Sequence, residues 1–193
     1  MLNTQRIAFK EWASIVQLLG TGEQVLILRK GGIHEKGKKF NVAHEEFFLF
    51  PTFEHQSPRD LKPEGEKILK QVLEKKPARD ILPIQFYCVV QDGFWISDEK
   101  TLEPLEPFHL WSRDCLKARF HWGEEKGLFG ILVRTYSLPE VVNLENLTRY
   151  GGCRSWVELE RPIETRLLEP VLGDNLFQEK AGQIHQVIEE FAS

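Results

Sequence analysis

The spacing of apolar residues predicts two amphipathic helices, one near each end of the chain. Over residues 5–19, apolar side chains recur every three or four positions, which is typical of one face of a helix. Thr4 precedes this stretch as a candidate N-cap. Near the other end, Asn175 precedes a similar pattern. We therefore expect a second amphipathic helix over residues 175–193.

Short apolar runs between these helices predict a series of strands. They lie at residues 24–28, 47–50, 84–90, 94–96, 128–136 and 155–159. Pro51 is expected to end the second run, and residues 91–93 to form a turn. Two further helices are predicted, one with Pro63 in its first turn and one capped by Ser112. Because several strands follow one another without a helix between them, we predict an α+β fold with a curved, mostly antiparallel sheet.

Length and composition fit one ordinary soluble domain. The chain has 193 residues, of which 41% are hydrophobic and 28% charged, close to the average globular protein. We expect one domain over residues 1–193. No apolar run matches a signal-peptide core or a membrane span, and the three cysteines form no CxxC pair. A cytoplasmic protein without a disulfide framework is therefore expected.

The formal net charge of -4 excludes a broad polycationic surface. Residues 151–193 carry 4 basic and 8 acidic groups, whereas residues 1–60 carry 8 basic and 7 acidic groups. The negative charge is therefore concentrated near the C-terminus. The nearly neutral remainder is still compatible with a local phosphate site.

A first polar cluster follows the first predicted strand. Arg29 and Lys30 lead into Gly31 and Gly32, with His34 two residues later. A Gly-Gly turn can expose backbone N–H groups to an anion, and an arginine can hold phosphate through two parallel hydrogen bonds. We treat these five residues as candidate ligand-binding residues. The spacing matches no phosphate-binding loop motif, so the alternative is a tight turn at a sheet edge with solvated charges.

A second polar cluster follows the aromatic-rich run at residues 47–50. Glu54, His55 and Gln56 lie side by side in the sequence there and could bind the edge of a base, with His55 and Glu54 as weak catalytic candidates. The alternative is a core strand leading into a polar turn. Three histidines and four glutamates occur within residues 34–55, but their spacing matches no helical metal motif. We expect no metal ion and no cofactor.

A third segment mixes cations with aromatic rings, a combination found where arginine holds phosphate and rings stack on bases. It comprises Arg113, Arg119, His121, Trp122, Arg134 and Tyr136. In the alternative interpretation, the rings belong to the core and the arginines pair with Asp114 and Glu124.

Two sequence blocks carry a family resemblance. The blocks LILRKGGIHE, residues 26–35, and FFLFPTFEHQ, residues 47–56, resemble a bacterial, largely cyanobacterial family known only as domain-of-unknown-function family 1802. The resemblance extends over essentially the whole chain, including the LVRTYSL and YGGCRSW segments. It implies no established activity. Because some members are fused to restriction-endonuclease-like domains, it implies a role beside restriction–modification.

A more distant similarity concerns the segment from Gly22 to Lys30. Gly22-x-Gln24, followed by a strand that ends in Arg29-Lys30, resembles the opening of the PUA-like barrels called ASCH or EVE domains. This similarity implies a barrel-like sheet and binding of RNA or modified bases.

These observations lead to three functional hypotheses. The first is a non-enzymatic accessory domain that binds nucleic acid or a phosphorylated small molecule, with residues 29–32 on phosphate and Glu54–Gln56 on a base. The second is a metal-dependent phosphodiester hydrolase with His55 as general acid or base and Glu54 or Glu35 on the metal ion. The third is a protein-interaction subunit that uses its C-terminal helix. No membrane partner is expected.

Overall fold

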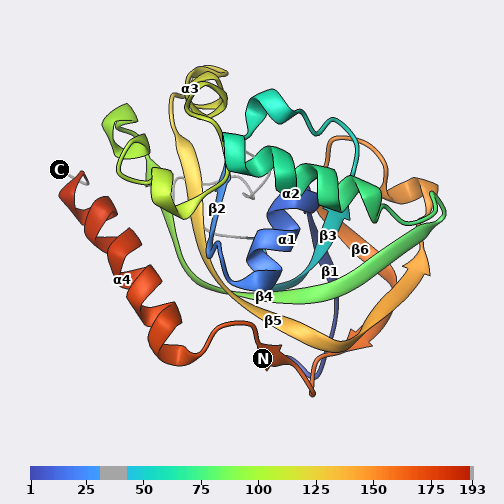
Figure 1. The fold of residues 1–193 in the computed structure, drawn as a ribbon. Coiled ribbons are helices and arrows are strands. Elements are labelled where there is room, and N and C mark those ends of the chain that lie inside the picture. The colour runs from blue at the N-terminus through green and yellow to red at the C-terminus, as the bar shows by residue number, and fades with distance from the viewer. Residues whose placement is uncertain (31–42, 192–193) are drawn as a thin grey trace.

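The computed structural model describes residues 1–30 and 43–191, in which four α-helices accompany a seven-stranded sheet (Figure 1). The strands are β1 (Thr4–Trp12), β2 (Leu26–Arg29), β3 (Glu46–Thr52), β4 (Ile81–Ile96), β5 (Leu128–Glu145), β6 (Trp156–Glu164) and β7 (Glu169–Pro170). The helices are α1 (Ala13–Thr21), α2 (Pro63–Glu74), α3 (Arg113–His121) and α4 (Asp174–Glu190).

The sheet has the strand order β2-β5-β4-β3-β1-β6, with β7 paired to β5. The β1–β3 pair is parallel and the other pairs are antiparallel. The predicted α+β class and the mostly antiparallel, curved sheet are therefore confirmed. Register shifts between Ile84 and Phe86 and between Val90 and Asp92 interrupt the long β4–β5 ladder, and irregularities of this kind bend strands. The predicted turn at residues 91–93 is wrong, because β4 continues through it.

The N-terminal half of the first predicted helix is also wrong. Residues 4–12 form β1, which pairs with β3 on one side and β6 on the other, and α1 begins only at Ala13. Ala8 and Phe9 point to opposite faces of the sheet, yet both are fully buried, in different apolar clusters. Because both faces of β1 are covered, the alternation that identifies a strand is missing from its sequence.

The residues predicted to begin two other helices are confirmed. Pro63 is the first residue of α2, and the Ser112 hydroxyl caps α3 by accepting a hydrogen bond from the Cys115 backbone N–H, as expected. Pro51 lies inside β3, contrary to expectation. At this position β3 pairs only with β1, so no second strand requires the N–H that proline lacks. The C-terminal helix begins at Asp174 rather than after an Asn175 cap.

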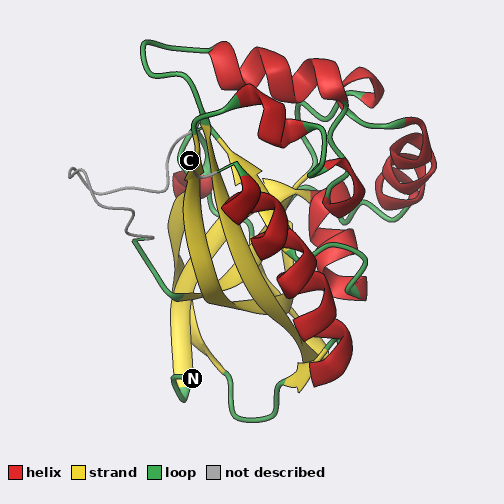
Figure 2. Cartoon of the chain, turned by 90° about the vertical axis from the view of Figure 1, so that its left-hand side faces the viewer, coloured by secondary structure: helices red, strands yellow, loops and turns green. Residues whose placement is uncertain are grey.

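Two apolar clusters form the core. The larger one packs α1, α3 and α4 against the sheet, and Figure 2 shows the helices gathered mainly on one side of the strands. The smaller one joins residues of β1, β3 and β6 to the first half of β4 and the second half of β5. The bent sheet therefore packs partly against itself.

Arg29, at the end of edge strand β2, links this strand to a distant part of the sheet. Its guanidinium donates to the Lys10 carbonyl, lies 3.3 Å from the Glu11 carboxylate on β1, and donates to Ser155 Oγ at 3.0 Å. The Glu11 side chain is only 1% exposed. Three strands separate β2 from β1 in the sheet order. One side chain thus closes the curved sheet where no backbone ladder does.

His109 is a titratable group in the core, between the short 3-10 helix Glu106–Phe108 and α3. Its side chain is 6% exposed, and Lys62 Nζ donates to its carbonyl oxygen at 2.8 Å. Burial, assisted by the charge of Lys62, lowers the pKa of His109 from 6.5 to about 3. The folded protein therefore holds this imidazole neutral over most of the acid range.

Replacing Arg29 by methionine should lower the free energy of unfolding by about 3 kcal/mol, because the Glu11 carboxylate would stay buried without its cation. Urea unfolding followed by circular dichroism measures this. Arg113→Met, which removes an exposed arginine paired with Glu103 and Glu106, should lower the free energy of unfolding far less, because water screens exposed ion pairs. Equal losses in the two variants would contradict the role given to Arg29.

Acid should destabilise the protein through His109. Below pH 6.5 the unfolded chain binds a proton at this residue that the folded chain excludes down to about pH 3. The free energy of unfolding should therefore fall by up to about 1.4 kcal/mol per pH unit from this residue as the pH drops. In urea titrations between pH 4 and 7, His109→Gln should flatten this dependence, whereas the exposed His185→Gln should not. Identical slopes for the two variants would disprove the assignment of this pH dependence to His109.

Candidate functional site

A cationic pocket lies where β1, β2 and α3 meet. Its volume is about 220 Å³, and it is lined by Glu11, Trp12, Arg29, Lys30, Trp111 and Arg119. The first two residues end β1, the next two lie at the end of β2, and the last two come from α3 and the segment before it. The pocket therefore combines three cations with one carboxylate and two indole rings.

Arg119 is held by aromatic rings rather than by an acid. Its guanidinium carbon lies 3.7 Å from the centroid of the Trp111 ring and 5.8 Å from that of Trp12. The two indoles meet edge to face with centroids 4.8 Å apart. In the described part of the chain, Arg119 forms no ion pair with a carboxylate. Stacking thus fixes its direction and leaves its N–H donors without an acidic partner.

Lys30, which the sequence predicts as a phosphate ligand, is held by backbone carbonyl groups. Its ammonium donates to the carbonyl oxygens of Phe120, Glu125 and Gly127. These three bonds use all the N–H donors of a lysine, and they tie β2 to the connection between α3 and β5. Lys30 therefore supplies positive charge to the pocket without a free hydrogen-bond donor.

Arg29 is oriented by the contacts that close the sheet. Glu11 Oε2 faces its guanidinium, and Glu11 Oε1 accepts from the Trp12 backbone N–H at 2.8 Å. Each partner thus holds the other in place at the wall of the pocket. A charge fixed in this way needs no reorganisation before a ligand binds.

The second predicted cluster lies at the same end of the sheet but outside this lining. Because β1 and β3 are parallel, with Trp12 paired to Thr52, the turn after β3 follows close to the end of β1. Glu54 and His55 are exposed in this turn, and His55 has a positive φ of 61°. Gln56 accepts from the N–H and hydroxyl of Ser14 and donates to the Thr52 carbonyl. Gln56 thus fastens the start of α1.

The structure therefore brings together only part of the predicted set. Arg29 and Lys30 share the cationic pocket, whereas Glu54, His55 and Gln56 do not line it. The predicted residues Gly31, Gly32 and His34 lie outside the described residues. Within residues 1–30 and 43–191, no group of three or more histidine, cysteine or acidic side chains is arranged to hold a metal ion.

The third predicted segment is dispersed. Arg113 pairs with Glu103 and Glu106 rather than with Asp114, and Arg134 pairs with Asp174 of α4. Trp122 is 72% exposed and not part of the core. From this segment only Arg119 reaches the pocket.

Sequence reasoning missed Glu11, Trp12 and Trp111 as residues of this site. Glu11 and Trp12 fall within the helix predicted over residues 5–19, and the sequence carries no separate signal for Trp111. The available signal was a charged residue and a tryptophan at the end of what proves to be a strand.

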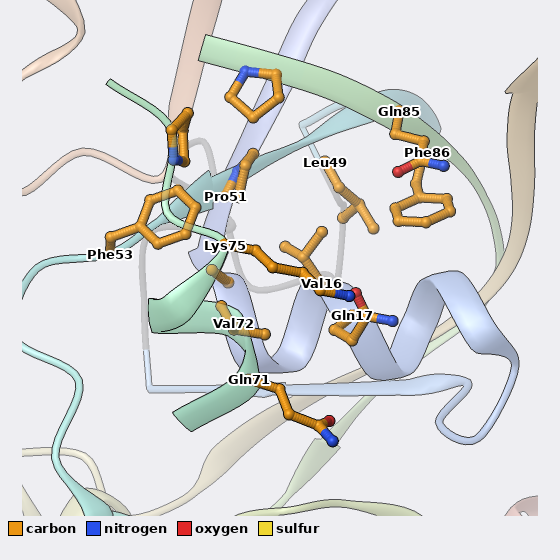
Figure 3. A pocket seen from close by; sticks show the side chains of 13 residues that line it. Val16, Gln17, Leu49, Pro51, Phe53, Gln71, Val72, Lys75, Gln85 and Phe86 are labelled. Atoms are coloured by element: carbon orange, nitrogen blue, oxygen red, sulfur yellow. The ribbon is translucent and has the colours of Figure 1, made fainter. Parts of the chain in front are cut away.

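An apolar groove between α1, α2 and the strands β3 and β4 offers different chemistry (Figure 3). Its volume is about 270 Å³. Val16, Leu49 and Phe86 line it together with several prolines, and Lys75 is the one charged side chain among its described lining residues. With one cation among these residues, against three in the cationic pocket, the groove does not suit a phosphate group.

Helix α4 uses its apolar face within the chain. Phe177, Ala181 and Ile184 are buried in the larger core cluster. Leu176 of the same helix is 56% exposed. No helix in the described residues combines the length and apolar character needed to span a membrane.

Comparisons with known proteins place the chain in a family. No curated protein matches it. Among solved structures, it is similar to the crystal structure of ASCH from Zymomonas mobilis, with a TM-score of 0.46 and 10% sequence identity over 93% of each chain. The family described as Domain of unknown function (DUF1802) matches residues 8–183, which confirms the resemblance seen in the sequence, and the protein belongs to this family.

Proposed function

We propose that the cationic pocket binds one nucleotide of a nucleic acid and that the protein is a binding domain rather than a hydrolase. The observation that carries this proposal is the Arg119 guanidinium, which stacks on Trp111 and pairs with no carboxylate among the residues that the structure describes. Arginine presents paired N–H groups that match phosphate oxygens, so this group is suited to a phosphate.

The remaining lining supports a nucleotide over a simple anion. Trp12 is only partly buried, and an indole face accepts any nucleobase by stacking. Three cations against the single Glu11 carboxylate leave an excess of positive charge. The volume of about 220 Å³ is below that of typical pockets for drug-sized ligands, which favours a single nucleotide unit.

The hydrolase alternative gains no support from the described residues, since His55 and Glu54 lie on an exposed turn without a metal-ligand cluster. The role beside restriction–modification that the family resemblance implies would place this binding on DNA. We therefore propose that both RNA and DNA be tested.

Nucleoside monophosphates of both sugar types should quench the tryptophan fluorescence of the protein saturably, because Trp12 and Trp111 line the pocket. Arg119→Ala should weaken this binding about tenfold or more, the usual cost of losing a charge-assisted hydrogen bond. Inorganic phosphate alone should bind more weakly, since it cannot stack.

The matched control is Arg113→Ala, which removes an exposed guanidinium from the same helix outside the pocket. It should bind nucleotides like the unmodified protein. Absence of nucleotide binding, or equal affinities for the two arginine variants, would refute the proposed function.

A further inference from the structure

A second cationic hollow, the arginine groove, lies along edge strand β6. Its volume is about 390 Å³, and it is lined by Arg6, Arg149, Tyr150, Arg154, Trp156, Val157 and Glu158. The candidate residues that the sequence predicts at 29–34 and 54–56 are not among its described lining residues. Its chemistry is set by three guanidinium groups around one carboxylate.

Within residues 1–30 and 43–191, two of the three guanidinium groups have no protein partner for their N–H donors. Arg6 pairs with Glu158 and donates to the carbonyls of Leu159 and Glu160. Arg149 and Arg154 are exposed, and within the described residues neither forms an ion pair or a hydrogen bond through its guanidinium. The single carboxylate of the groove is therefore already neutralised, and two arginines stay available to an anion.

The floor of the groove is rigid. The Tyr150 ring is 3% exposed, and its hydroxyl accepts from the Glu160 N–H at 2.8 Å. The Arg149 guanidinium lies 5.4 Å from the centroid of this ring. Trp156 packs on Phe9 with ring centroids 4.7 Å apart. Arg149 thus projects from a fixed aromatic surface.

Lys10 anchors the segment that carries the two free arginines. Its ammonium donates to the carbonyls of Tyr150 at 2.7 Å and Gly152 at 3.0 Å. Burial, and after it the charge of Arg154, lowers the pKa of Lys10 below its usual value. Positive charge is therefore crowded here, and a bound anion would relieve the repulsion.

The same segment connects the arginine groove to the cationic pocket. Ser155, the neighbour of Arg154, accepts a hydrogen bond from Arg29 of the pocket. One short stretch, residues 150–155, thus touches both sites. A small cationic pocket and an open cationic groove joined by one short segment are an arrangement that suits a polynucleotide strand.

We infer that the arginine groove binds the phosphodiester backbone of the strand whose nucleotide occupies the cationic pocket. This inference rests on the proposed function and extends it from a mononucleotide to a single-stranded oligonucleotide. Guanidinium groups suit this ligand because they bind phosphate oxygens in pairs, with no requirement for a particular base.

The test compares the double variant Arg149→Ala/Arg154→Ala with the unmodified protein. Binding of labelled single-stranded RNA and DNA, each eight nucleotides long, is measured by fluorescence anisotropy. Affinity should fall about tenfold or more. The slope of log K against log salt should become shallower by about 1.4, as expected for two lost phosphate contacts on a single strand. Binding of nucleoside monophosphates should not change.

The matched control, Arg79→Ala/Arg166→Ala, removes two exposed arginines that do not line the groove. It should retain both the affinity and the salt slope. If the two double variants bind the oligonucleotide equally, the inference is overturned, while mononucleotide binding in the pocket stands. If Arg119→Ala affects neither ligand, the proposed function fails instead. Competition by polyglutamate as strong as by unlabelled oligonucleotide would identify an acidic-peptide site and overturn the inference as well.

Discussion

The structure depends on neutralising one buried carboxylate. Glu11 lies on β1 with 1% of its side chain exposed, and a buried charge without a partner is strongly destabilising. Its cation, Arg29, comes from an edge strand that is separated from β1 by three strands in the sheet order. The pair is satisfied only when the sheet curves far enough to bring these strands together. The same contact directs a guanidinium to the wall of the cationic pocket, so sheet closure and site geometry have a common cause.

The basic residues of this acidic chain fall into distinct classes once their partners are known. Lys30 is saturated by carbonyl oxygens, Arg29 is paired with Glu11, and Arg119 is stacked on an indole. Arg149 and Arg154 have no partner for their charge among the described residues. An anion binds best to the cations that the fold of a protein leaves without a partner. That set is local, and a net charge of -4 does not describe it.

Sequence reasoning succeeded where a structural feature depends on neighbouring residues. The start of α2 at Pro63 and the Ser112 cap are local, and so is the apolar pattern of α4. Reasoning failed at β1, because burial on both faces removes the alternation of a strand, and this error hid Glu11 and Trp12. The state of Arg29 could not be predicted from its neighbours, since its partners lie 18 and 126 positions away. Contacts of that range depend on topology.

The position of β6 has a consequence for the order of events during synthesis. This strand is near the C-terminal end of the sequence but pairs with β1, the first strand of the chain. Ser155, which Arg29 contacts, and the arginines at 149 and 154 also emerge late. A sheet whose first and last segments meet has a high contact order and forms slowly. Neither the closure of the sheet through Arg29 and Ser155 nor the arginine groove can therefore form before residues 149–164 have been added to the chain.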